Sequence, residues 1–157
     1  IDGRRIPYDT TGHRDHSWGA REWQAIQHWR WFQGQSGPGL SAHFLEIFIA
    51  GQRYVRGYLY QDGQMTEVTD VDLRFEHEKT LQPISMEAVL RDDAGRQLHI
   101  RGTPVATYPF LIAPTTINTQ SGMALEFDGQ PGVGWFELSW PKAYVDYMSA
   151  REEYPSA

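Results

Sequence analysis

Residues 53–68 read RYVRGYLYQDGQMTEV, two runs rich in β-branched and aromatic residues that meet at Asp62-Gly63. An Asp-Gly pair between two such runs is typical of a two-residue β-hairpin turn, because both residues tolerate the positive φ angles that this turn requires. The segment therefore predicts two antiparallel strands joined at Asp62 and Gly63.

The next segment, VDLRFEHE (71–78), alternates between apolar and polar residues. Val71, Leu73 and Phe75 fall on one face of an extended chain, since successive side chains of a strand point to opposite faces. This pattern favours an antiparallel strand with one buried face and one face in water.

Strand signals continue in both directions along the chain. They occur in HWRWFQ (28–33), LSAHFLEIFIAG (40–51), SMEAVLRDDAGRQLHIRG (85–102) and MALEFDGQPGVGWFELSW (123–140). The last two segments contain turn residues, around Asp93-Ala94-Gly95 and between Asp128 and Gly134, so each predicts a hairpin. We expect eight to ten antiparallel strands that close into a barrel or sandwich, because closure removes unpaired edges. A barrel of this size can hold one small ligand.

One helix is expected, at the C-terminal end, in PKAYVDYMSAREE (141–153). Pro141 suits the first helical position, where its missing N–H costs nothing, and Tyr144, Tyr147 and Met148 form one stripe. No linker or repeat divides the chain, and 157 residues are typical of one domain. We therefore treat residues 1–157 as a single all-β domain with a short helix.

Composition excludes several classes of function. The net charge is −6 and the 14 basic residues form no cluster, which argues against binding to nucleic acid. No apolar run is long enough to cross a membrane as a helix. Cysteine is absent, so there is no thiolate nucleophile, and the cytoplasm is only the default location. The chain starts at Ile1, which indicates a processed product or a piece of a longer protein.

The most unusual segment is TGHRDHSWGAREW, residues 11–23. HRD (13–15) also opens the catalytic loop of protein kinases, but that loop needs an Asn where this chain has Ala20, so the kinase interpretation fails. A metal site is a second interpretation, with His13, Asp15 and His16 joined by His28 or His43. That pattern is weak, because His16 would lie opposite the other two on a strand.

Proton transfer is the third interpretation of this segment. Asp15 and His16 could act as acid and base beside Trp18 and Trp23, whose rings would stabilise a positive charge on a protonated alkene. The plain structural alternative is a polar clasp, in which Asp15 pairs with Arg14 or Arg21 and ties down an irregular segment.

GHRDHSWG (12–19) resembles the signature of the carotenoid hydratase (hydroxyneurosporene synthase) and AttH-like group. The matching positions are Gly12, Asp15, His16, Ser17, Trp18 and Gly19. The resemblance continues more loosely through Arg21 and Trp23, the RGYLYQDG and DDAGRQLHIRG hairpins and the closing GVGWFELSW.

The resemblance implies a lipocalin-like β-barrel and acid-catalysed addition of water to an isoprenoid double bond without a cofactor. It places acid–base roles on His16 and Trp18, with Asp15 in the motif. Full-length members of the group have two lipocalin-like halves, with this signature opening the second, so a missing N-terminal half or a homodimer would be the expected partner. Those hydratases also carry a Tyr and an acid on a following strand, whereas SAHFLEIF here offers His43 and Glu46.

Two acidic residues lie among aromatic rings of predicted strands. Glu46 is flanked by Phe44 and Phe48, and Glu137 shares a face with Trp135. Each is either a functional acid or one half of a buried ion pair with an Arg. Tyr58 belongs to a row of tyrosines whose hydroxyls would line the barrel interior or form a ladder outside it.

Two functions from different classes follow. The first is a cofactor-independent hydratase, isomerase or cyclase that acts by proton transfer on a hydrophobic, isoprenoid-like small molecule in the barrel, without a metal. Its expected catalytic residues are Asp15, His16 and Glu46, its ligand contacts are Trp18, Trp23, His43, Tyr58 and Trp135, and its structural residues are Gly12, Arg14, Gly19 and Arg21. The second is a binding module for an apolar ligand, in which GHRDHSWG is a structural clasp. An open cavity lined by Asp15, His16, Trp18 and Glu46 would favour the enzyme, whereas a cavity filled by side chains, with Asp15 bound to Arg21, would favour the clasp.

Overall fold

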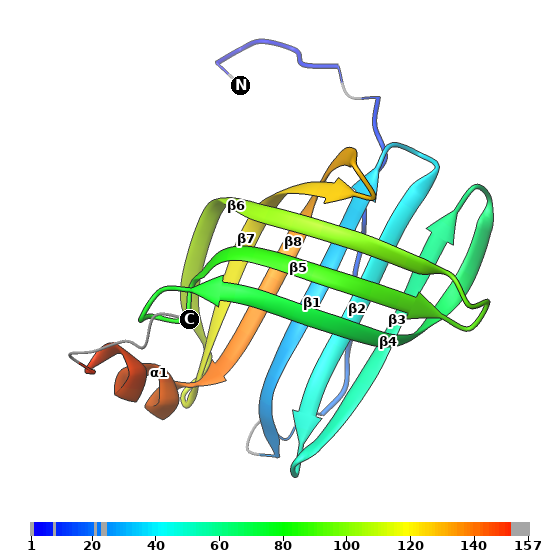
Figure 1. The fold of residues 1–157 in the computed structure, drawn as a ribbon. Coiled ribbons are helices and arrows are strands. Elements are labelled where there is room, and N and C mark those ends of the chain that lie inside the picture. Colours follow the sequence, from blue (N-terminus) through cyan, green and yellow to red (C-terminus); the bar gives the residue numbers. More distant parts are fainter. Residues whose placement is uncertain (1, 8, 21, 23–24, 152–157) are drawn as a thin grey trace.

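The computed structural model describes residues 2–7, 9–20, 22 and 25–151. Eight antiparallel strands close into a barrel in chain order, with β1 paired to β8, and a short helix follows (Figure 1). The elements are β1 Ile26–Ser36, β2 Leu40–Ile49, β3 Gln52–Gln61, β4 Gln64–His77, β5 Pro83–Asp92, β6 Gln97–Ala113, β7 Thr116–Phe127, β8 Gln130–Pro141 and α1 Lys142–Ser149. The expected lipocalin-like all-β barrel with a C-terminal helix is confirmed.

Three of the hairpin turns have two residues, both with positive φ. They are Ala50-Gly51, Asp62-Gly63 and Asp128-Gly129, with φ angles between 47° and 86°. This is the turn geometry that matches the right-handed twist of the flanking strands. The predicted turn at Asp62-Gly63 is confirmed, whereas the turn expected across 128–134 is only two residues long and β8 begins at Gln130.

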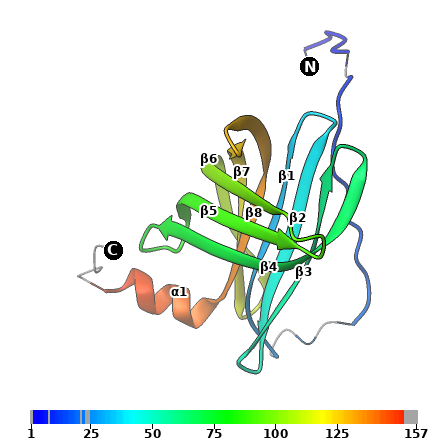
Figure 2. The same ribbon diagram turned by 45° about the vertical axis from the view of Figure 1, so that its right-hand side comes forward.

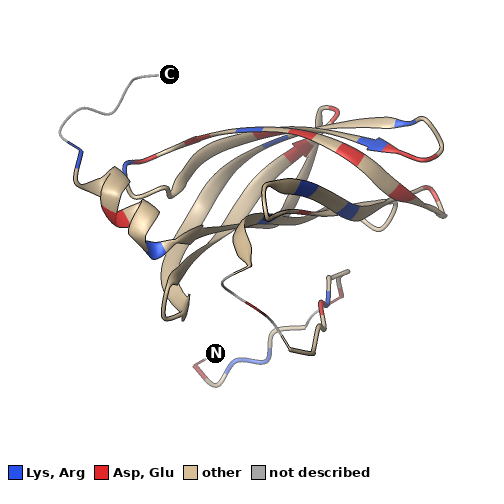
Figure 3. Ribbon diagram, turned by 90° about the horizontal axis from the view of Figure 1, so that it is seen from below, with Lys and Arg blue, Asp and Glu red and all other residues tan. Residues whose placement is uncertain are grey.

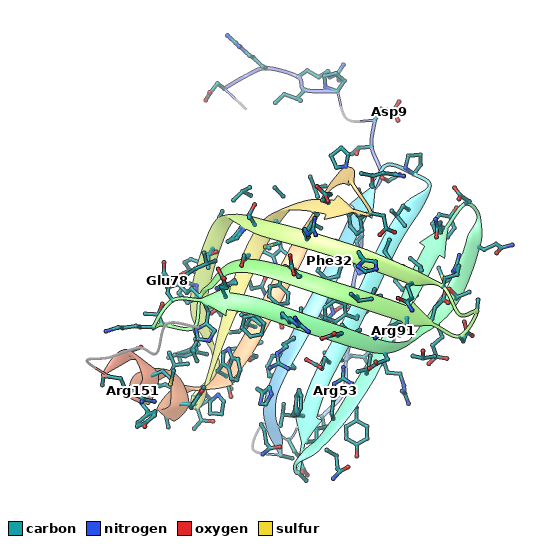
Figure 4. The ribbon with its side chains drawn as sticks, in the orientation of Figure 1. Asp9, Phe32, Arg53, Glu78, Arg91 and Arg151 are labelled. Carbon is teal, nitrogen blue, oxygen red and sulfur yellow. The ribbon has the colours of Figure 1, made fainter. Side chains whose placement is uncertain are left out.

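The strands form two crossing layers. β4, β5 and β6 run across β1, β2, β3, β7 and β8, as the two views in Figures 1 and 2 show. Phe32, Phe44, Phe127 and Phe136 are fully buried between the layers, and Figure 4 shows Phe32 at this central place. A Cβ atom added at Gly34 would lie only 2.5 Å from Leu125 Cδ1. Side chains therefore pack the barrel interior tightly.

Two strands of the barrel separate along most of their length. The ladder between β3 and β4 has four pairs only, from Tyr58↔Glu67 to Gln61↔Gln64. Below it, the side chain of Arg53 spans the gap, donating to Asp70 Oδ1 at 2.9 Å and to the carbonyl of Val71. Arg53 also donates to Glu46, so side chains close the barrel where backbone pairing stops.

Glu46 is the centre of this closure. Its side chain is 5% exposed and accepts from Arg53 Nε at 2.6 Å and from Arg30 Nη1. Arg30 also lies over the rings of Phe48 and Phe75. The carboxylate of Glu46, on β2, thus links this strand to β1 through Arg30 and to β3 through Arg53.

Strand β6 is longer than the sequence indicates. It pairs with β5 only as far as Gly102, and from Thr103 onward it pairs with β7 alone. Pro104 and Pro109 lie in this second part, where one edge of the strand has no ladder and a missing N–H is tolerated. Because of these two prolines, the sequence pattern of residues 103–113 does not predict a strand.

Helix α1 begins at Lys142, with Pro141 at the N-cap and not at the first helical position, and its buried face differs from the predicted stripe. Val145 and Met148 are buried against Leu81, whereas Tyr144 and Tyr147 are 41% and 59% exposed. The predicted stripe included the two tyrosines, but the aliphatic Val145 takes their place in the buried face. Among the residues that the structure describes, no helix has the length and apolar character needed to cross a membrane.

Replacing Glu46 with Gln should destabilise the fold. Glu46→Gln leaves the Arg30 and Arg53 guanidinium groups without their shared carboxylate, and we expect the free energy of unfolding to fall by about 3 kcal/mol. Urea denaturation followed by circular dichroism measures this loss. Glu87→Gln is the control, because its ion pair with Arg101 is exposed and should contribute less than about 1 kcal/mol. Equal, small losses in both variants would contradict the role of Glu46.

Candidate functional site

A pocket of about 800 Å³ lies on the outer face of the barrel. Residues 13–17 form one wall, and strands β1, β2 and β8 form the floor. The lining residues are His13, Asp15, Ser17, Ile26, Trp29, Trp31, Gln33, His43, Leu45, Ile47, Ile112, Gln120, Trp135 and Glu137. This pocket is therefore outside the barrel, between the barrel wall and the segment that precedes β1, and not in the interior where a ligand was expected.

Strand alternation explains why this face is apolar. In β1, Phe32 points into the core while Trp31 points outward, and in β2 the same holds for Phe44 and Leu45. Lys, Arg, Asp and Glu gather instead on β4 and β5, whereas the layer with β1, β7 and β8 is almost free of them (Figure 3). An aromatic outer face with few charges is the kind of surface that a covering segment or a ligand buries.

Two histidines meet at one end of the pocket. The rings of His13 and His43 have centroids 5.8 Å apart, and both rings contact Trp31. His13 Nδ1 lies 3.2 Å from the hydroxyl of Tyr58, which in turn lies 3.3 Å from Ser41 Oγ. The predicted ligand contacts His43 and Tyr58 therefore belong to one cluster, with His43 in the pocket and Tyr58 behind His13.

His43 is held in one tautomer. Its Nδ1 lies 2.7 Å from the carbonyl oxygen of Phe32, which can only accept, so Nδ1 carries the proton and donates. Burial lowers the pKa of His43 below its usual 6.5, and the proximity of His13 adds to this, while the Phe32 carbonyl and Asp15 act in the opposite direction. At neutral pH the ring is therefore uncharged, and Nε2 presents a basic lone pair.

Close backbone packing places His43 against Tyr58. Gly57 pairs with Phe44, and a Cβ atom at this position would lie 2.1 Å from the carbonyl oxygen of His43. Only glycine fits there without moving strand β2. Gly57 is therefore needed both for the pairing of β2 with β3 and for the position of His43 beside Tyr58.

A second polar group lies in the aromatic half of the pocket. Glu137 accepts from Trp29 Nε1 and, at 3.0 Å, from Gln120 Nε2. Gln120 accepts in turn from Trp135 Nε1 at 2.9 Å. Among the described residues Glu137 forms no ion pair with an arginine, and its hydrogen bonds come from neutral donors.

The GHRDHSWG segment is extended, and its alternate residues face opposite ways. His13, Asp15 and Ser17 face the pocket, whereas His16 and Trp18 do not line it, and Trp18 is 82% exposed. The ring of His16 contacts Trp18 and its Nδ1 lies 3.4 Å from Arg14. The sequence analysis expected Asp15, His16 and Trp18 to contact the same ligand. In the structure Asp15 lines the pocket and the other two do not.

The remaining predicted site residues lie apart from the pocket or outside the described chain. Glu46 is on the inner face and paired with two arginines, so it does not join Asp15. Arg21 and Trp23 fall outside the described residues, and so does any pair between Asp15 and Arg21. No ion pair with Arg14 holds Asp15 within the part that is described. Gly12 and Gly19 are exposed, and Gly19 has a φ of 123°.

Metal binding finds no support in the geometry. Across the described residues, no three His, Asp or Glu side chains lie close enough together to hold a metal ion. His13 and Asp15 do share the pocket, but His16 points away from it and His28 stacks between Phe48 and Trp140 on the inner side.

Several pocket residues were not singled out from the sequence. They are Trp29, Trp31, Leu45, Ile47, Ile112 and Gln120. The first four could have been found from the sequence, because they are apolar residues at outward positions of β1 and β2, where no core requires them. Ile112 comes from the part of β6 that the two prolines concealed, and Gln120 comes from the first half of β7, which the sequence did not predict as a strand.

A protein-family model described as "Domain of unknown function (DUF7064)" matches residues 1–142. The match covers the barrel and the preceding segment, so the chain belongs to this family. No curated protein and no solved structure gives a significant match.

The state of His43 can be measured directly. Because burial lowers its pKa, the folded protein resists protonation of this ring, and stability that is complete above pH 6.5 should decline as the pH falls below that value. Long-range ¹⁵N–¹H NMR spectra should show the Nδ1–H tautomer at pH 7 and a midpoint below 6.5. A midpoint above that of the same histidine in the urea-unfolded chain would contradict the burial described here.

Proposed function

We propose that this member of the family binds a small hydrophobic molecule in the outer pocket and acts on it by proton transfer, as a cofactor-independent acid–base enzyme. The observation that carries the proposal is the uncharged His43, fixed as a base by Phe32, at the end of an aromatic pocket. Buried bases of this kind occur where proton transfer is catalysed.

The walls of the pocket support a hydrophobic ligand. Trp31, Leu45, Ile47 and Ile112 belong to the apolar half of the lining residues, and the other half carries polar groups that fix the orientation of a ligand. This combination is typical of sites for small organic molecules, in which apolar walls provide affinity and a few polar groups fix orientation. The volume of about 800 Å³ lies within the range of such sites.

The cluster of His43 and His13 favours isomerisation over hydration. In the proposed step, His43 Nε2 takes a proton from a carbon next to a double bond of the ligand. The electron pair of the broken C–H bond forms a new double bond to the neighbouring carbon, and the electron pair of the original double bond forms a C–H bond at its far carbon. His13, which lines the pocket, donates the proton to that far carbon and regains one through the hydroxyl of Tyr58 behind it. Asp15 stabilises the imidazolium of His43 by its charge, in keeping with its effect on the pKa of this ring.

One observation favours the alternative, a binding module without catalysis. The segment before β1 is tied to the barrel by Gln35 Nε2, which donates to the carbonyl of Thr11 at 2.9 Å, and by the His13–Tyr58 contact. These contacts are those of a structural clasp. In that case the histidines orient the ligand and do not exchange its protons.

Deuterium exchange separates the two functions without a known substrate. The protein is incubated in D₂O with an organic extract of the cells that express it, and the small molecules are analysed by mass spectrometry. We expect wild-type protein to introduce deuterium at carbon into one hydrophobic compound, and His43→Gln to reduce the rate by a factor of about 10²–10⁴.

His99→Gln is the matched control, because His99 is on the exposed side of β6 and outside the pocket. Its exchange rate should equal that of wild type. A compound that co-purifies with the protein but gains no deuterium would favour the binding module, and equal exchange by His43→Gln would refute the role of His43.

A further inference from the structure

The charge of the pocket lining is one-sided. Asp15 and Glu137 contribute carboxylates, and none of the described lining residues is Lys or Arg. His43 is uncharged at neutral pH. The pocket therefore has a negative potential, in a place where apolar walls reduce screening by water.

Glu137 is half-buried, and its partners differ from those of the buried carboxylates Glu46 and Asp92. Glu46 is neutralised by Arg30 and Arg53, and Asp92 by Arg96 at 2.6 Å. Glu137 has no cationic partner among the described residues and is held only by neutral N–H donors from Trp29 and Gln120. Its orientation is fixed while its charge is not compensated.

Three tryptophans surround this carboxylate. Trp31 is directly opposite Glu137 in the β1–β8 ladder, Trp29 donates to it, and Trp135 is two residues before it on the same face of β8. All three line the pocket. The face of an indole ring attracts cations more strongly than any other side-chain ring.

We propose that this corner, made of Trp29, Trp31, Trp135 and Glu137, binds an organic ammonium group on the ligand. An anion would be repelled by two carboxylates, and a neutral group would leave the charge of Glu137 uncompensated. A methylated or alkylated ammonium satisfies the carboxylate and also contacts the rings through its carbon atoms. The proposal rests on the proposed function, since it defines the ligand of the same pocket as a hydrophobic amine.

The test compares choline with 3,3-dimethylbutan-1-ol, a neutral molecule of nearly the same shape. Binding is followed in the wild-type protein by the indole N–H signals of Trp29, Trp31 and Trp135 in NMR spectra, assigned by single Trp→Phe variants. We expect choline to shift these signals and to bind about tenfold or more tightly than the alcohol.

Two variants locate the site. Glu137→Gln keeps the shape and an acceptor for Trp29 but removes the charge, and it should abolish the preference for choline. Trp135→Leu keeps an apolar side chain but removes the ring, and should weaken choline binding by a similar factor. Glu126→Gln is the matched control, because Glu126 is an exposed glutamate on neighbouring β7 that pairs with Arg101 at 3.7 Å outside the pocket, and it should bind choline as wild type does.

Each contrary outcome has a defined meaning. Equal binding of choline and the alcohol, or a preference for choline that survives in Glu137→Gln, overturns the ammonium site and leaves the hydrophobic pocket in place. Failure of both probes to shift the three indole signals also overturns it. The deuterium-exchange comparison of wild type with His43→Gln is independent of these probes, so a failure of the proposed proton transfer is recognised separately.

Discussion

The ion pairs of Glu46 are the interaction on which the barrel and the pocket both depend. Arg30 comes between Trp29 and Trp31 on β1, and Glu46 comes between Leu45 and Ile47 on β2. The charged residues point inward and hold the two strands together, while their neighbours point outward and form the floor of the pocket. A buried carboxylate costs desolvation energy, but with two guanidinium groups bound it defines the alignment of β1, β2 and β3.

Much of the fold was predictable, because it depends on local signals. The Asp62-Gly63 turn and the alternation of Val71, Leu73 and Phe75 both reflect steric rules that act over a few residues. What could not be predicted depends on contacts between distant strands. Because β3 separates from β4, the carbonyl of Val71 is available to accept from Arg53. No pattern near Arg53 in the sequence reveals this contact.

The site was predictable in composition but not in orientation. Asp15, expected as a catalytic residue, and His43 and Trp135, expected as ligand contacts, line the pocket. His16 and Trp18, expected beside them, do not line it. In an extended segment the parity of a residue decides which way it faces, and the sequence does not show which parity meets the barrel. The same uncertainty concealed that the apolar outer face of β1, rather than the interior, carries the pocket.

One wall of the pocket is held much more weakly than the other. The floor belongs to a closed sheet, whereas residues 9–20 form neither helix nor strand and are attached by a few side-chain contacts such as those of Gln35 and Tyr58. Local opening of such a segment requires far less free energy than unfolding of the barrel. For the proposed ligand, local opening of this segment provides a route into the pocket. Substitutions in the segment should then change the rate of ligand exchange while the thermal stability of the barrel stays the same.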